Sequence, residues 1–172
     1  MLERNGFNGI RGLALAAATL MAFLSTSGVN AEPAPREALL DRIQIEDMMI
    51  EYYTILPQRD HHDLGKYFAS NAELVLNGES YKGRDAIQKF YDGALDPRIE
   101  PGKSYNMLLG NPRIKVTENT ATMDAIWTGI LSDHATAPPR LIEQGTEHTD
   151  LIKQDGRWLV TRRVIVSESG LP

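Results

Sequence analysis

The stretch ATMDAIWTGIL, residues 121–131, alternates side chains with a period of two along one uninterrupted run. This period is typical of a β-strand, in which successive side chains point to opposite faces of a sheet. One face carries Ala121, Met123, Ala125, Trp127, Gly129 and Leu131. The other carries Ile126 and Ile130, so both faces of the sheet hold apolar side chains. The back of the sheet then needs a cover, and a homodimer is the simplest one.

Three further stretches with the same period surround this strand, at about residues 105–116, 141–153 and 158–166. Turn-forming residues connect them, which predicts an antiparallel meander. The facing of the strand at 141–153 stays open. Two alternative sets of residues could form its inward face: Ile142, Thr146, His148 and Ile152, or Leu141, Gly145 and Leu151. A bulge at Gly145 would change that facing.

The chain before residue 104 has a helical period instead. Apolar side chains recur at helical spacing over 45–56, and Pro57 ends that helix. Asp60 can cap a second, shorter helix. A short hairpin turning at Asn77-Gly78 and a third helix near 84–91 follow. This order predicts an α+β domain, with three N-terminal helices packed on a curved, mainly antiparallel sheet.

The first 31 residues have the layout of a secretory signal peptide. Arg4 and Arg11 precede an uncharged apolar run over 13–23, and a small-residue segment ends at Ala31. The run is too short to span a bilayer comfortably. We therefore expect a mature domain of residues 32–172 that is periplasmic or secreted, with no membrane attachment after cleavage.

Composition excludes several classes of function. The net charge is −5 with scattered Lys and Arg, which argues against nucleic acid as a partner because phosphate binding needs concentrated positive charge. The absence of Cys excludes disulfides, thiolate chemistry and Cys-ligated metals. Adjacent His61 and His62 point in different directions on a helix and rarely ligate one metal. With no Gly-rich phosphate loop either, the sequence predicts no cofactor and no metal.

Five groups of short motifs lie in a fixed order along the chain. They are Glu51-Tyr52-Tyr53 with Arg59-Asp60, YFASNAEL at 67–74, YKGRDAIQKFY at 81–91, NPRIKV at 111–116, and DGRW at 155–158 with Arg163. Together they resemble the NTF2-like superfamily of cone-shaped α+β domains, in particular its SnoaL-like branch. That superfamily includes ketosteroid isomerase, scytalone dehydratase and polyketide cyclases. The resemblance implies a conical pocket between the sheet and the first helix, and often a dimer.

The resemblance carries over only part of the known chemistry. The oxyanion tyrosine of ketosteroid isomerase falls on Tyr52, and its second oxyanion donor falls near His148. Its base aspartate falls on Leu76, which cannot accept a proton. The turn aspartate of scytalone dehydratase falls on Pro57, and one of its histidines falls near Asn106 or Met107. Neither enzyme's full set of residues is therefore present.

Tyr52 and His148 are the candidate catalytic residues. A phenol at Tyr52 can donate a hydrogen bond to a carbonyl or enolate in a dry pocket; the alternative is a core tyrosine bonded to backbone. Histidine titrates near neutrality, as a general acid or base requires; the alternative is an exposed sheet histidine. Expected pocket residues are Tyr53, Leu76, Asn106 and Trp127, and Trp127 also fits the core.

These residues predict an enzyme without a cofactor. Its substrate would be a small, largely apolar carbonyl or hydroxyl compound, and its reaction an isomerisation, dehydration or hydration. The lack of a carboxylate base at Leu76 or Pro57 motivates an alternative, a non-catalytic binding module that uses the same cone. A dimeric interaction domain with a filled cone is a third possibility.

Overall fold

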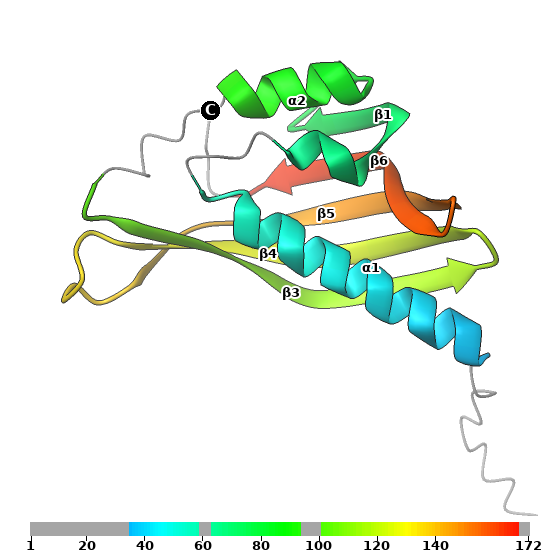
Figure 1. Cartoon of the computed structure of the whole chain (residues 1–172). Helices are drawn as coiled ribbons and strands as arrows, with labels where there is room; N and C mark the ends of the chain where they lie inside the picture. The colour runs from blue at the N-terminus through cyan, green and yellow to red at the C-terminus, as the bar shows by residue number, and fades with distance from the viewer. Residues whose placement is uncertain (1–34, 59–62, 94–100, 169–172) are drawn as a thin grey trace, which may run out of the picture. The chain divides into compact units, whose positions relative to one another are not determined.

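Six strands form one sheet in the order β2-β1-β6-β5-β4-β3 (Figure 1). The computed structural model describes residues 35–58, 63–93 and 101–168. Strands β1 and β6 run parallel, and the remaining neighbours run antiparallel. This confirms an α+β fold with a curved, mainly antiparallel sheet. The strands are β1 (Phe68–Leu76), β2 (Glu79–Lys82), β3 (Ser104–Thr117), β4 (Thr120–Ser132), β5 (Arg140–Gln154) and β6 (Arg157–Ser167).

Helix α1 (Arg36–Ile55) lies across one face of the sheet (Figure 1). Its buried side chains recur at helical spacing, and Pro57 follows soon after its last residue, as the sequence predicts. Helix α2 (Arg84–Gly93) packs beside β1 and buries Ile87 and Tyr91. The face of the sheet beneath α1 is called the inner face below. The side-chain core packed between them is called the cone interior.

The second predicted helix is wrong. Leu64–Tyr67 forms a single 3-10 turn, η1, and Phe68 already belongs to β1. Phe68 lies opposite Val160 in the parallel β1–β6 pair, so the chain must be extended at that point. Pairing across the sheet overrides the local helical pattern. Asp60, His61 and His62 lie outside the described residues, and so does the N-terminal segment that contains the expected signal peptide.

Two tight turns have the backbone that their sequences predict. Asn77 and Gly78 have φ values of 49° and 93°, and Asp155 and Gly156 have φ values of 49° and 76°. Two successive positive φ values match the twist of an antiparallel hairpin, and Asn-Gly and Asp-Gly adopt them readily. The second turn aligns β5 with β6, which brings Thr149 opposite Arg163.

The inner face of β5 carries mainly polar residues, which resolves the open facing of this strand. Its buried residues are Glu143, Gly145, Glu147, Thr149 and Leu151. Pairing between β4 and β5 is irregular near Gly129, and pairing between β5 and β6 is irregular near Asp150, while Gly145 itself pairs regularly. Of the set Leu141, Gly145 and Leu151, the last two face inward, whereas no member of the set Ile142, Thr146, His148 and Ile152 is among the buried residues. Neither set included the buried Glu143, Glu147 and Thr149.

The outer face of the sheet carries exposed apolar side chains on four strands, as the alternation of β4 predicts. These exposed side chains are Leu108 (52% exposed), Ile126 (38%), Leu141 (62%) and Val166 (49%). Within the described ranges, no helix is long and apolar enough to cross a membrane.

Candidate functional site

A buried ion pair lies at the centre of the cone interior. Arg163 of β6 is fully buried, and Glu147 of β5 is 4% exposed. The Arg163 Nε donates to Glu147 Oε2 at 2.8 Å, and its Nη2 donates to the same oxygen. The Tyr53 hydroxyl of α1 also donates to Oε2 at 2.8 Å and accepts from Arg163 Nη2 at 2.8 Å. Three elements distant in sequence thus meet at one carboxylate oxygen.

Aromatic rings enclose this ion pair. The Arg163 guanidinium lies 4.2 Å from the ring centroid of Tyr52 and 5.2 Å from that of Tyr53, within cation–π range. The Tyr52 hydroxyl forms a hydrogen bond with the hydroxyl of Tyr91 from α2. Burial raises the pKa of all three tyrosines, so they stay protonated at neutral pH. Burial acts to lower the pKa of Arg163, but Glu147 and the tyrosines outweigh it and raise that pKa.

Four buried polar atoms of this region have no hydrogen-bond partner within the described part of the chain. They are Glu147 Oε1, Arg163 Nη1, Thr149 Oγ1 and Trp127 Nε1. A buried polar group without a partner costs about 1–3 kcal/mol, so native proteins hold few of them. All four atoms belong to buried residues of the neighbouring strands β4, β5 and β6: Trp127 is paired with Gly145, and Thr149 is paired with Arg163.

Two glycines make room for large side chains on the inner face. A Cβ at Gly145 would lie 2.5 Å from Trp127 Cζ2 and 2.2 Å from the Val166 carbonyl oxygen. A Cβ at Gly129 would lie 2.5 Å from Glu143 Cγ. Glu143 is 2% exposed and accepts a hydrogen bond from the Tyr105 hydroxyl. The inner face of β5 therefore holds two buried glutamates, with the indole of Trp127 against the glycine between them.

The structure does not bring His148 and Tyr52 together. His148 lies on the outer face, with a side chain that is 45% exposed. Its Nδ1 is 2.7 Å from Asp124 Oδ1 and its Nε2 is 3.3 Å from Asp150 Oδ1. The hydrogen bond that His148 donates to the Asp124 carboxylate raises the pKa of His148, against a smaller effect of burial. The expectation that His148 faces the pocket is corrected: it alternates with Glu147 and Thr149, which point inward.

The expected pocket residues divide between the two faces. Tyr53 and Trp127 are buried on the inner side, at 3% and 5% exposure. Leu76 is half-buried at the end of β1. Asn106 is exposed, and its amide donates to Ser104 Oγ at 3.3 Å. Its expected place in the pocket is wrong, because it is paired with Ile130 on the outer face.

Sequence reasoning missed the residues at the centre of the site. The sequence alone gives Glu147 no role, and Arg163 enters only as part of a motif. The usable signal is an arginine in β6, three residues after the buried Val160 and followed directly by Val164, Ile165 and Val166. An arginine in such a strand needs a buried anion, and only the fold shows that Glu147 supplies it.

The comparisons with known proteins agree with this architecture. The SnoaL-like domain family matches residues 37–164. The chain belongs to the SnoaL-like domain family. No curated protein matches it. Its relation to the family therefore rests on the domain match and on solved structures.

Three solved structures place this SnoaL-like chain in the wider fold. An NTF2-like protein with a cystatin-like fold from Novosphingobium aromaticivorans is 19% identical, with 78% of this chain and 86% of that chain covered and a TM-score of 0.66. A candidate scytalone dehydratase from the same organism is 24% identical (75% and 85% covered, TM-score 0.59). A candidate calcium/calmodulin-dependent protein kinase II association domain from Xanthomonas campestris is 15% identical (74% and 87% covered, TM-score 0.57). These identities establish the fold alone.

Within the described residues, no three His, Asp or Glu side chains are placed so that they could hold a metal ion.

Proposed function

We propose that this SnoaL-like protein is an enzyme without a cofactor that acts in the periplasm or outside the cell. Its substrate is a small, mainly apolar compound that carries a carbonyl or hydroxyl group. The observation that supports this proposal is the set of four buried polar atoms without partners around Arg163 and Glu147. The secretory layout of residues 1–31 supports the location, and a mature N-terminus at Glu32 would test it.

The unpartnered atoms specify the chemistry of the ligand. Arg163 Nη1, the Thr149 hydroxyl and the Trp127 indole N–H donate hydrogen bonds, and Glu147 Oε1 accepts one. A carbonyl oxygen suits the donors, and a hydroxyl suits both kinds of partner. The rings of Tyr52 and Tyr53 favour an apolar body. A small ring compound with one or two oxygens satisfies all of these groups at once.

The same groups support acid–base chemistry. Glu147 Oε1 takes a proton from the carbon beside the carbonyl, and the C–H electron pair moves to the carbonyl oxygen as an enolate. Arg163 and a phenolic proton stabilise that oxygen, because preformed donors in a dry site lower the cost of developing charge. Tyr52 and Tyr91 together have two hydroxyl protons, and the hydrogen bond between them uses one. The other proton is the one that the pair can donate to the ligand oxygen. Return of the proton from Glu147 to another carbon completes an isomerisation. In a dehydration, the enolate expels a β-hydroxyl group, which takes the proton from Glu147 and leaves as water.

A non-catalytic binding module is the second candidate. Histidine is the side chain whose ordinary pKa lies near neutrality. The described histidines, His134 and His148, are both exposed, so neither lies in the interior. Such an interior can hold a ligand without turning it over. Under this alternative the same polar atoms bind the same class of compound, and only turnover distinguishes the two.

Hydrogen exchange in D2O separates enzyme from binding module. The probes are cyclohex-2-enone and α-tetralone, with binding followed by ligand-observed NMR and α-proton loss by ¹H NMR. The enzyme accelerates the exchange of α-protons. Glu147→Gln, under conditions in which circular dichroism shows it to be folded, abolishes that acceleration, and the outer-face control His148→Gln keeps it. Binding without exchange supports the module. Exchange that survives Glu147→Gln and disappears in His148→Gln would refute the proposed site.

We also infer that two copies pair through the outer face of the sheet. The exposed apolar side chains Leu108, Ile126, Leu141 and Val166 lie on four neighbouring strands, and such a patch is unusual on a monomer. A two-fold axis through this face would bury the patch of each copy against the other.

A further inference from the structure

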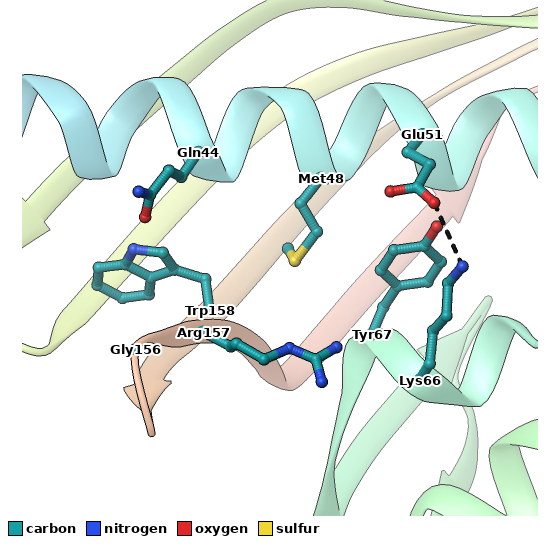
Figure 2. Close-up of a pocket in the computed structure, with 8 residues that line it drawn as sticks. All are labelled: Gln44, Met48, Glu51, Lys66, Tyr67, Gly156, Arg157 and Trp158. Atoms are coloured by element: carbon teal, nitrogen blue, oxygen red, sulfur yellow. Dashed lines mark hydrogen bonds and ion pairs between the residues drawn. The ribbon is translucent and has the colours of Figure 1, made fainter.

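A second hollow lies outside the cone interior, between α1, η1 and the β5–β6 turn (Figure 2). Its volume is about 380 Å³, in the range of small-molecule pockets. Helix α1 contributes three lining residues at successive helical turns, which are Gln44, Met48 and Glu51. Met48 lies one helical turn before Tyr52, and the Tyr67 ring lies 5.7 Å from the Tyr52 ring, so this hollow adjoins the site around Arg163. Its lining residues are nevertheless different from those of that site.

The aromatic wall of this hollow is held in place. Trp158 Nε1 donates to Asp41 Oδ1 at 3.1 Å, and Lys153 Nζ donates to the same oxygen at 2.6 Å. The hydrogen bond from Lys153 lowers the pKa of Asp41, against burial, so this carboxylate stays charged. The indole is therefore fixed in orientation before any ligand arrives, which reduces the entropy lost on binding.

The charges of the hollow leave one cation available. Lys66 Nζ lies 3.2 Å from Glu51 Oε1 and 5.0 Å from the ring centroid of Tyr67. Arg157 is exposed and makes no ion pair or hydrogen bond within the described residues. Figure 2 shows its side chain extending across the hollow below Met48, with the guanidinium toward Tyr67.

We propose that this hollow binds a small aromatic carboxylate. The guanidinium of Arg157 presents parallel N–H donors that match the two oxygens of a carboxylate. The ring of the ligand packs against Trp158 and the Met48 side chain, which supply a flat apolar surface and a polarizable sulfur. Glu51 sets the geometry, because its negative charge repels the carboxylate away from Lys66 and toward Arg157.

Isothermal titration with benzoate tests the proposal on the purified protein. We expect saturable binding that Arg157→Gln weakens by about tenfold or more, the range for loss of a charged hydrogen-bond pair. Arg113→Gln is the matched control, because Arg113 is an exposed arginine on β3 away from the hollow. It leaves the affinity unchanged. Glu51→Gln removes a nearby negative charge and tightens binding by about two- to fivefold, the range of exposed charge effects.

Three results would overturn the proposal. The first is no saturable binding of benzoate at millimolar concentrations. The second is equal weakening by Arg157→Gln and Arg113→Gln, which would indicate a general charge effect. The third is equal affinity for benzamide, which has the same ring without the negative charge. Binding that depends on Glu147 and not on Arg157 would place benzoate in the cone interior and count against this hollow.

Discussion

Removing either partner of the Arg163–Glu147 ion pair should destabilise the fold at least as much as removing both. Arg163 is fully buried and Glu147 nearly so, so Arg163→Met leaves an uncompensated carboxylate, and Glu147→Gln leaves an uncompensated guanidinium. Each single change should cost about 3–5 kcal/mol, which rivals the whole stability of a typical domain. The double variant leaves no unpaired charge at this position, so it should lose no more than about one single change, with a coupling energy of about 3 kcal/mol or more.

The measurement is urea unfolding followed by circular dichroism for the four proteins of this double-mutant cycle. Equal slopes against denaturant are required for the free energies of unfolding to be compared. Arg162→Met is the control: Arg162 pairs with Glu73 at 3.3 Å on the surface and should cost under about 1 kcal/mol. If the losses from Arg163→Met and Glu147→Gln add to within about 0.5 kcal/mol, the two side chains act independently, and the description of a buried centre is refuted.

Three further predictions concern packing, pH and assembly. Gly145→Ala should cost about 1–3 kcal/mol in chemical unfolding, because its Cβ meets backbone, whereas Gly93→Ala, with nothing within 4 Å, should be close to neutral. Because the pKa of His148 is raised, its pair with Asp124 stabilises the fold below the ordinary histidine pKa, and this contribution is lost as pH rises through the raised value. His148→Gln should therefore lower the free energy of unfolding more at about pH 6 than at about pH 9, by under about 1 kcal/mol for an exposed pair. Equal losses at the two pH values would contradict this. Light scattering should show a dimer that Ile126→Lys converts to a monomer, and a monomeric parent protein would end the outer-face proposal.

Sequence periodicity predicts the strands well and the site poorly, for physical reasons. The strand expected at 121–131 is β4, Thr120–Ser132, because its inward residues are almost all apolar and the alternation is strong. The facing of β5 stayed open because Glu147 and Thr149 point inward, which hides the alternation. A polar side chain can be buried when another element of the fold supplies its hydrogen-bond or ion-pair partner. Such long-range contacts leave no local pattern in the sequence.

The short second helix and the place of His148 failed for the same reason. Phe68 is extended because Val160 of a distant strand lies beside it. His148 is titratable and lies close to the family position, yet its neighbours Glu147 and Thr149 take the inward places. The centre of the site joins Tyr53 to Glu147 across 94 positions of the chain. Contacts of that range depend on register, which periodicity alone does not determine.

The most direct test of the central claim is the free energy of unfolding of Thr149→Val, measured on protein stripped of bound small molecules. The Thr149 hydroxyl is fully buried without a partner in the described structure, and we attribute this to a ligand that the cone interior binds. Removing it should raise the stability by about 1 kcal/mol or more and weaken the binding of the ring-ketone probes. A loss of stability would show that the hydroxyl already has a partner within the fold, and would contradict a ligand site at this position.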